Sequence, residues 1–261
     1  MELCRAALRL PERQGTGMIV FVSAMPQEIA SFHLPRNDWE GVPRMLAGRM
    51  AGKQVWATAT GMGWRPTIRV VDEMLNNMPI KALISIGFSG GTAKALRPGE
   101  LVLCRKVRLA GMGDGPREMT CHAGLLEAAR RAAGATPTRW SEGDGLTADH
   151  VASSAREKEE LGRSYEVHAV DMESFWVGMA ASERNVPFLA VRAILDPQAE
   201  SVPDLNPFIT ADGRLRGGHA ARHFALRPQS WPGFLRMGLG ARRASRSLGV
   251  WAMAFAREVH P

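Results

Sequence analysis

The stretch Val170-Asp171-Met172-Glu173-Ser174 is followed, twenty residues after its start, by Ala190-Val191-Arg192-Ala193-Ile194-Leu195-Asp196. Between the two, apolar side chains at 175, 176, 179 and 180 recur at helical spacing. A turn at 185–187 ends this pattern, and the apolar run after it predicts a buried strand. We therefore expect Glu173 in the first turn of a helix and Asp196 just past the next strand. Because ligands of open α/β sheets bind at the carboxyl ends of strands, these two acids are the first active-site candidates.

Strand and helix patterns also alternate along the chain before this stretch. Apolar runs predict strands at 18–24, 55–60, 82–86 and 99–104, and helical patterns cover 67–78, 121–133 and 154–163. This alternation predicts a parallel or mixed sheet that is covered by helices on both faces.

Glu28 is a third acid expected near the carboxyl end of a strand. It follows the first apolar run, and Pro26 suits the first turn of a helix at that point. A favourable interaction with the helix dipole would explain an acid here equally well. The pattern alone leaves open whether Glu28 has a structural or a chemical role.

Two further segments have the composition of ligand loops. Gly87-Phe88-Ser89-Gly90-Gly91 directly follows the strand at 82–86, so we expect a glycine-rich turn that lets backbone amides approach a ligand, with a plain tight turn as the alternative. It matches neither the GxGxxG pattern nor a P-loop. Asp149 and His150 lie in a polar stretch before the helix at 154–163, where a surface histidine is the commoner explanation of His150.

The composition indicates a globular protein of the cytoplasm. Its 261 residues, 45% of them hydrophobic, suffice for a sizeable core. The three cysteines form no CxxC pair or His/Cys cluster, so neither a disulfide framework nor a zinc site is indicated. No apolar run is long enough to span a membrane, and the first seventeen residues lack the pattern of a secretory signal.

The net charge of +7 is concentrated in the last fifth of the chain. From Arg214 onward there are nine arginines and one acid, Glu258, whereas residues 1–213 hold 24 basic and 25 acidic side chains. This distribution argues against a nucleic-acid partner and predicts a basic tail with a purpose of its own.

Four motifs occur in a specific order along the chain: Ala24-Met25-Pro26-Gln27-Glu28, Thr60-Gly61-Met62-Gly63, the segment 87–91, and the opening pair. Together they resemble the nucleoside phosphorylase and nucleosidase superfamily over about residues 18–196. The segments 205–217, 227–229 and 232–235 are similar to its hopanoid-associated branch, the adenosylhopane nucleosidases, which release adenine from a lipid-linked adenosine. The resemblance implies an α/β protein with a three-layer α/β/α, nucleoside phosphorylase-like fold and a mixed, partly barrel-like central sheet. We expect a catalytic domain over 18–213 and a basic amphipathic helical C-terminal extension over 214–261.

The resemblance also implies roles for individual residues. Asp196 would protonate the purine at N7, Glu173 would bind the ribose hydroxyls above Met172, and Glu28 would position and deprotonate the attacking water. The chemistry calls for such a set, because breaking an N-glycosidic bond builds positive charge on the sugar and negative charge on the base. Burial could raise the pKa of Asp196 enough for it to donate a proton near neutral pH. No metal or redox cofactor is expected.

A base and ligand loop completes the predicted site. Its members are Gly87, Phe88, Ser89, Gly90, Asp149, His150 and Val151. His150 or Val151 falls near the place where methylthioadenosine nucleosidases stack an aromatic ring on the base, and Leu195 replaces a serine that is common beside their acid. These departures count against a small thionucleoside substrate.

The nucleophile is expected to be water. Phosphorylases of the superfamily hold phosphate with arginines and a serine near the first strand and the glycine turn. Here Ser85 and Phe88 occupy the corresponding positions, and no arginine lies between Arg13 and Arg36. Phosphate would lack its bidentate partner.

Residues 229–259 have the pattern of an amphipathic helix with arginines on its polar side. Such a helix can lie in the headgroup plane of an anionic membrane, which would place the protein at the inner membrane face. The alternative is a C-terminal helix that packs on the core with a solvated basic face.

The sequence thus predicts a nucleosidase that hydrolyses a 5′-substituted adenosine, in particular adenosylhopane. The alternatives are a soluble methylthioadenosine/adenosylhomocysteine nucleosidase, a purine nucleoside phosphorylase, and a non-catalytic module tethered to a membrane. Because relatives form dimers or larger rings, a homodimer is the default expectation.

Overall fold

The computed structural model describes residues 17–36, 45–111 and 117–259. The expectation about a secretory signal concerns residues 1–17. Of these, only Gly17 belongs to the described part of the chain. In the described part, no helix is both long and apolar enough to cross a membrane.

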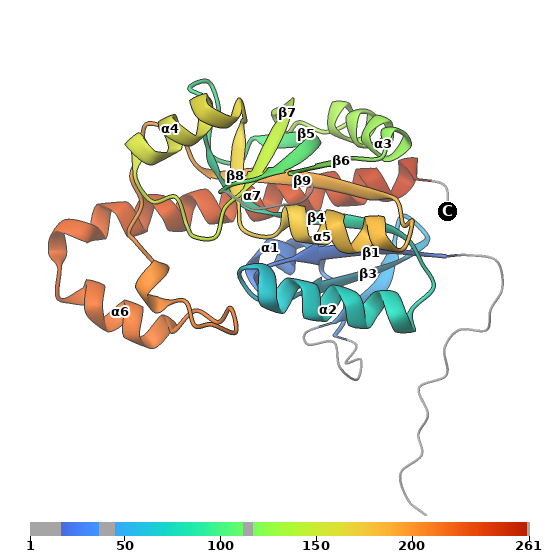
Figure 1. The fold of residues 1–261 in the computed structure, drawn as a ribbon, viewed down its shortest axis with the longest axis horizontal. Coiled ribbons are helices and arrows are strands. Elements are labelled where there is room, and N and C mark those ends of the chain that lie inside the picture. Colours follow the sequence, from blue (N-terminus) through green and yellow to red (C-terminus); the bar gives the residue numbers. More distant parts are fainter. Residues whose placement is uncertain (1–16, 37–44, 112–116, 260–261) are drawn as a thin grey trace, which may run out of the picture.

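Within the described residues, a mixed sheet of nine strands forms the centre of the fold (Figure 1). The strands are β1 (Met18–Ser23), β2 (Leu46–Met50), β3 (Lys53–Ala59), β4 (Ile80–Gly91), β5 (Leu101–Leu109), β6 (Glu118–Thr120), β7 (Trp140–Thr147), β8 (Ala169–Asp171) and β9 (Phe188–Asp196). β1 lies between β3 and β4 and is parallel to both. Five strands close into a ring, since β4 pairs with β9, β9 with β5, β5 with β7, β7 with β8, and β8 with β4. This closure confirms the mixed, partly barrel-like sheet.

Helices cover the sheet on both sides (Figure 1). The α-helices are α1 (Pro26–Ile29), α2 (Trp64–Asn77), α3 (Ala123–Gly134), α4 (Ala155–Tyr165), α5 (Ser174–Glu183), α6 (Gly217–Ala225) and α7 (Trp231–Glu258). Short 3-10 turns lie at Ala30–Phe32, Asn206–Phe208 and Pro228–Ser230. α2 packs against α5, whereas α7 packs against α3, β9 and α1. The predicted α/β architecture is confirmed.

The long helix α7 has two different halves. Its C-terminal half lies in the core, where Leu248, Trp251 and Phe255 are fully buried and Trp251 stacks on Phe255 at 4.8 Å. Its N-terminal half exposes Trp231 and Leu235 to solvent. The alternative of a helix packed on the core therefore describes the second half, and the boundary at residue 213 stays a prediction.

The glycine-rich segment 87–91 differs from its expected structure. It continues β4 to the end of that strand, and none of its glycines has a positive φ. The prediction of a turn at this place is wrong, because glycine in a strand serves close backbone approach as well as it serves a turn.

Candidate active site

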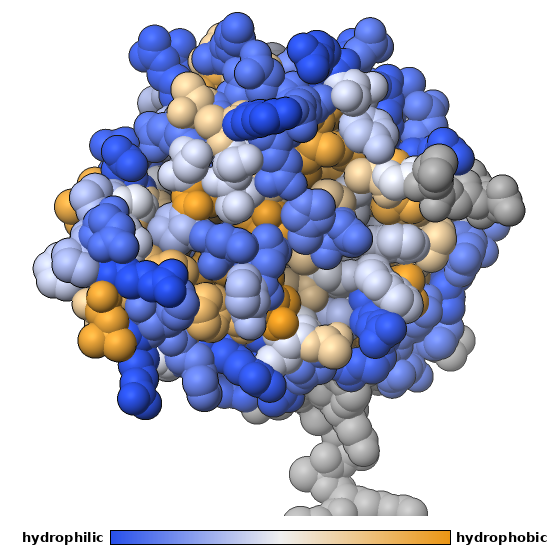
Figure 2. All heavy atoms as spheres, turned by 60° about the vertical axis from the view of Figure 1, so that its left-hand side comes forward, coloured by the Kyte–Doolittle hydropathy of each residue, from blue (hydrophilic) through white to orange (hydrophobic). Residues whose placement is uncertain are grey.

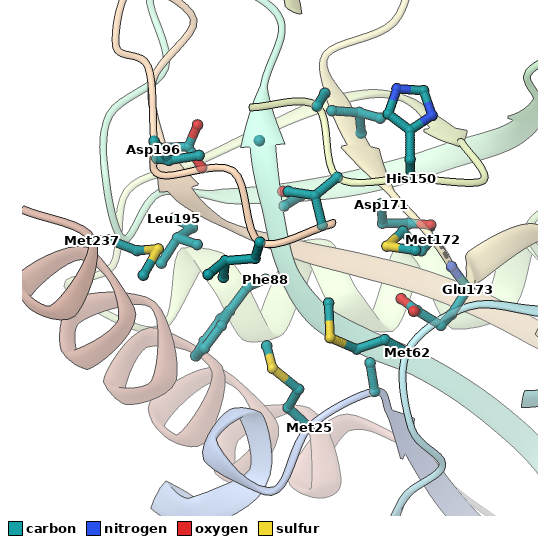
Figure 3. A pocket seen from close by; sticks show the side chains of 18 of the residues that line it. Met25, Met62, Phe88, His150, Asp171, Met172, Glu173, Leu195, Asp196 and Met237 are labelled. Atoms are coloured by element: carbon teal, nitrogen blue, oxygen red, sulfur yellow. Dashed lines mark hydrogen bonds between the residues drawn. The ribbon is translucent and has the colours of Figure 1, made fainter. Parts of the chain in front are cut away.

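A cavity opens at the carboxyl ends of the parallel strands β1, β4 and β9 (Figure 3). The space between its walls measures about 780 Å³ with the open mouth included. Glu28, Met172, Glu173 and Asp196 all line it. Figure 3 shows Asp196 on one side and Glu173 on the opposite side. The fold therefore brings together three acids that are far apart in the sequence.

The Glu28 carboxylate is held by three backbone amides. Helix α1 places Glu28 in its first turn, from which the side chain reaches back toward the preceding residues. Oε2 accepts hydrogen bonds from the amides of Ala24 (2.8 Å) and Met25 (2.7 Å), and Oε1 accepts one from Phe88 (2.7 Å). Burial raises the pKa of Glu28, although the amides and the nearby Arg192 oppose this rise. Such a fixed carboxylate can orient a water molecule and accept its proton.

Gly87 makes the contact between Glu28 and β4 possible. A Cβ atom on Gly87 would lie 2.8 Å from Glu28 Oε1 and would collide with the guanidinium of Arg192. Glycine at this position is therefore explained by close packing behind the site, not by contact with a ligand.

Arg192 is a residue of the site that the sequence patterns did not single out. It is only 1% exposed; its Nε lies 2.8 Å from Asp171 Oδ2, and its Nη2 donates to Ser85 Oγ. Although no arginine is near Glu28 in the sequence, the fold thus places Arg192 close to it in space. However, Arg192 is not among the residues that line the cavity, because its side chain is engaged behind the cavity wall. A charged residue inside the apolar run of β9 was the signal that could have revealed it.

Asp171 uses its other oxygen to fix the start of α5. Oδ1 accepts hydrogen bonds from the amides of Glu173 (2.9 Å) and Ser174 (3.0 Å) and from the hydroxyl of Thr147 (2.8 Å). An acid that accepts from the first amides of a helix satisfies donors that have no partner within the helix. Asp171 and Arg192 therefore determine where Glu173 enters the cavity.

Glu173 stands at the N-cap of α5 with Met172 beside it in the cavity wall. Its Oε1 accepts a hydrogen bond from the amide of Gly63 at 2.7 Å. Burial, together with the negative charge of Asp171, raises the pKa of Glu173 to about 8. The fold therefore favours the protonated form of Glu173 relative to the unfolded chain.

Replacing Glu173 with glutamine is expected to stabilise the fold at alkaline pH. The carboxyl has a pKa of 4.5 when unperturbed and about 8 in the fold, so unfolding releases a proton between these values and stability falls as the pH rises through them. The full difference is on the order of 5 kcal/mol. Because glutamine carries no charge and can still accept from Gly63, we expect the variant's melting temperature to exceed that of wild type by roughly 10 °C at pH 8.5.

Thermal unfolding between pH 5 and 8.5 tests this expectation, and the difference should shrink toward pH 5. Glu183→Gln, at the exposed end of the same helix, serves as the control. A constant offset between Glu173→Gln and wild type over this range would contradict the raised pKa.

Asp196 is the last residue of β9 and is 5% exposed. Burial raises its pKa, while the ammonium group of Lys158, which contacts Oδ2, opposes the rise. A carboxylic acid in this state can donate a proton to a ligand. Lys158 was not a candidate from the sequence, because it lies within a charged helical run that is typical of a solvated surface.

Only some residues of the predicted base and ligand loop line the cavity in the structure. Five of its residues line the cavity: Phe88, Ser89, Gly90, His150 and Val151. Gly87 lies behind Glu28, and the Asp149 side chain is 89% exposed. The Ser89 hydroxyl is buried and has no hydrogen-bond partner in the described part of the chain.

His150 belongs to a surface cluster at the cavity rim. Its imidazole points away from the cavity in Figure 3. Its two ring nitrogens lie 2.6 Å from Asp149 and 2.5 Å from Glu157, and these hydrogen bonds raise the pKa of His150. This arrangement agrees with the surface explanation of His150.

Apolar side chains from the segment 197–216 form a cover over the cavity. Val202, Pro203, Leu205 and Leu215 line it from this segment. The segment is fastened to the cavity wall by a pair of hydrogen bonds, in which the Asn206 carboxamide accepts from the amide of Val151 (2.8 Å) and donates to its carbonyl (3.0 Å). Met237 from α7 completes this apolar side of the cavity.

No metal site is visible in the described residues. Residues 17–36, 45–111 and 117–259 contain no group of three or more His, Cys, Asp or Glu side chains that could hold a metal ion.

The buried carboxyl groups of Glu28, Glu173 and Asp196 line one cavity, and all three have raised pKa values. Such a set is typical of an enzyme that performs acid–base chemistry on a small molecule. The sequence matches the phosphorylase superfamily over residues 18–216, and the chain belongs to this family.

Its relatives include nucleosidases. The 5′-methylthioadenosine/S-adenosylhomocysteine nucleosidase of Shewanella pealeana is 25% identical over 214 residues, which cover 75% of this chain and 93% of the relative. The fold resembles the futalosine hydrolase of Helicobacter pylori (TM-score 0.72, 14% identity, 93% and 98% of the two chains). It also resembles the 5′-methylthioadenosine/S-adenosylhomocysteine nucleosidase of Neisseria meningitidis in complex with methylthio-immucillin-A (TM-score 0.72, 17% identity, 94% and 100%).

Proposed function

We propose that the protein is a purine nucleosidase that hydrolyses the N-glycosidic bond of a 5′-substituted adenosine and releases adenine. The observation that carries the proposal is the placement of Glu173 and Asp196 on opposite walls of one cavity, with Glu28 fixed between the ends of β1 and β4. Relatives named as nucleosidases at similar length support the same reaction class.

Each acid has a place in this reaction. Asp196 donates its proton to N7 of the base, so that the electron pair of the breaking C1′–N9 bond leaves with a neutral adenine. Glu173 accepts hydrogen bonds from the ribose hydroxyls and, when ionised, stabilises the positive charge that develops on the sugar. Glu28 orients water toward C1′ and takes its proton.

Water is the proposed nucleophile because the arginine nearest to Glu28 has other partners. The guanidinium of Arg192 is used by Asp171, Ser174 and Ser85 behind the cavity. A phosphate in the cavity would thus find four acids and no arginine or lysine on the described cavity wall.

The proposed substrate carries a large apolar group on its 5′ carbon. The cavity wall contributed by Val202, Leu205, Leu215 and Met237 is apolar, and the side chain of Leu215 extends to the surface with 40% exposure. An apolar substituent would bury surface against this wall, whereas a free hydroxyl would lose water there without gaining a partner. Adenosylhopane has this chemistry, and we propose it as the substrate.

Chromatography of released adenine tests the substrate class. We expect a lipid-linked adenosine to give a kcat/KM at least about tenfold above that of methylthioadenosine, and adenosine to be the poorest, since each buried methylene contributes about 0.8 kcal/mol. A preference for methylthioadenosine would favour the soluble nucleosidase, and release that depends on phosphate would favour a phosphorylase.

The surface beside the cavity mouth is proposed to contact a membrane. Four apolar side chains are exposed there on α6–α7: Leu226 (78%), Trp231 (57%), Leu235 (68%) and Leu239 (44%). Figure 2, turned so that this end of the molecule comes forward, shows hydrophobic patches among hydrophilic ones. The same two helices carry a set of arginines: Arg222, Arg236, Arg242, Arg243 and Arg246. Arginines around exposed apolar side chains complement an anionic lipid surface, and a lipid-linked substrate would enter from such a surface.

Replacing Leu226, Trp231 and Leu235 with serine together is expected to weaken binding to anionic vesicles about tenfold or more. The substitutions avoid the buried half of α7, so the fold should persist, whereas removal of the helix would expose the core. Sedimentation with vesicles that contain phosphatidylglycerol is the measurement. Val250→Ser with Met253→Ser, also exposed but on the other half of α7, is the matched control. Equal sedimentation of both variants would contradict membrane contact at this surface.

The proposal also includes the assembly and location of the protein, which we propose to be a homodimer in the cytoplasm, at the inner membrane face.

A further inference from the structure

Lys158 is a fully buried lysine directly behind the proposed proton donor. It lies on α4 with 0% of its side chain exposed. Its ammonium donates to Asp196 Oδ2, to the carbonyl of Pro197 (2.8 Å) and to the carbonyl of Glu200 (2.6 Å). An ammonium has three hydrogens, so each of them has an acceptor. The lysine therefore ties one oxygen of Asp196 to the chain that follows β9.

The surroundings of the lysine are shaped to admit its long side chain. A Cβ atom on Gly90 would lie 3.1 Å from Lys158 Cδ and 3.2 Å from Val170 Cγ1, so glycine at this position leaves room for the lysine. Burying a charged amine in this way is costly unless it is fully paired. The position of the charge, within contact of one functional acid, is the reason to look for a role beyond packing.

Because Lys158 holds Oδ2, the other oxygen of Asp196 is the one left for the ligand. We propose that Lys158 is a positioning residue for the nucleosidase reaction: it presents Asp196 Oδ1 to the purine and stabilises the carboxylate that remains after the proton has gone to N7. This inference rests on the proposed function. In the step concerned, the Oδ1–H bond and the C1′–N9 bond break, N7–H forms, the electron pair stays on the adenine, and water adds to C1′ while its proton passes to Glu28. Glu28 then releases its proton to solvent, and solvent returns a proton to Asp196.

Four charged groups lie around Asp196, and two of them, Lys158 and Glu200, act on its pKa. Lys158 faces it from α4, Glu200 from the segment after β9, and Arg236 and Arg243 from α7, where they line a second cavity that also reaches Asp196. Burial raises the pKa of Asp196, Lys158 lowers it and Glu200 raises it. Without the lysine, burial and Glu200 would act with less opposition, so the acid would hold its proton to higher pH and give it up less readily.

The experiment compares kcat as a function of pH for wild type, Lys158→Met, Lys158→Gln and Lys158→Arg. Activity requires protonated Asp196, so it falls as the pH rises through the pKa of this group. We expect both neutral variants to move this falling limb up by about one to three pH units and to lower the maximal kcat about tenfold or more. Their KM should change little. Lys158→Arg, which keeps the charge, should retain the wild-type limb. Lys158→Gln can still donate hydrogen bonds to the two carbonyls. It is the second neutral variant, and it provides the test if Lys158→Met fails to fold.

A double-mutant comparison separates this role from a structural one. In an Asp196→Asn background, Lys158→Gln should cause no further loss of kcat, because the lysine acts through the acid. Two results would overturn the inference. One is a lower kcat in the neutral Lys158 variants without a shift of the falling limb of their pH profile. The other is a double variant whose loss of kcat equals the product of the losses in the two single variants. If wild type itself releases no adenine from any nucleoside, the proposed function fails instead, so the two failures are distinguishable.

Discussion

Asparagine in place of Asp196 is expected to lower kcat for adenine release by about 10²- to 10⁴-fold. The carboxamide has nearly the shape of the acid but cannot transfer a proton to N7, so the base would have to leave as an anion. Substrate affinity should change much less, because the amide can still hydrogen-bond to the purine. Chromatography of adenine under saturating substrate gives kcat directly.

The control for this variant is Asp72→Asn on α2, where the aspartate pairs with Arg184 on the outside of the fold. It should have wild-type kcat. If Asp196→Asn retains more than about a tenth of wild-type kcat, or if both variants lose activity equally, Asp196 is not the proton donor. The residual activity of Asp196→Asn should also be independent of pH on the alkaline side, since the titrating group is gone.

Glutamine in place of Glu28 is expected to lower kcat about 10²-fold or more, because the residue that accepts the water's proton is lost. The rising limb of the wild-type pH profile should lose the contribution of Glu28, since burial raises the pKa of Glu28 and activity requires its ionised form. The limb that remains should report Glu173, whose pKa is about 8. A cost in stability of about 1–3 kcal/mol is expected as well. Both oxygens of the carboxylate accept hydrogen bonds from backbone amides, whereas glutamine has only one acceptor oxygen.

Measuring thermal unfolding beside kcat separates these two effects. Gln in place of Glu127, an exposed residue of α3, is the matched control and should change neither quantity. A Glu28→Gln protein that unfolds earlier but keeps wild-type kcat would show that Glu28 only fastens α1 to β4. In that case the helix-dipole explanation of its position would be the better one.

The sequence was sufficient to place the acids in the fold because each follows an apolar run at a predictable boundary. Glu28 comes after β1, and Asp196 ends β9. Strand ends of this kind meet at one edge of a parallel arrangement, so local pattern was enough to place these side chains together. Helix α5 and strand β9 were also predicted from periodicity alone, and both occur in the structure.

Features that depend on distant contacts could not be predicted in this way. Strand β7 is polar and contains Gly143 and Gly145, so it lacks the pattern of a strand; its Gly143 is there because a Cβ atom would collide with His168. Arg192 and Lys158 are charged, and charged residues are ordinarily exposed. Only the folded structure supplies the acids that make their burial possible.

The tail illustrates the same limit. The amphipathic pattern of residues 229–259 predicted one helix, and α7 is one helix. The pattern did not distinguish the half that packs on Phe21 through Trp251 and Phe255 from the half that exposes Trp231 and Leu235. Both halves alternate apolar and polar residues, and only the presence or absence of a packing partner separates them.

The central claim, hydrolysis of a purine nucleoside, is tested most directly by identifying the sugar product with and without phosphate. Purified protein is incubated with a lipid-linked adenosine, and adenine, free ribosyl lipid and its 1-phosphate are quantified by mass spectrometry. We predict equal rates of adenine release in both buffers and a sugar product that carries a free anomeric hydroxyl. Release that requires phosphate and yields the sugar 1-phosphate would contradict the account.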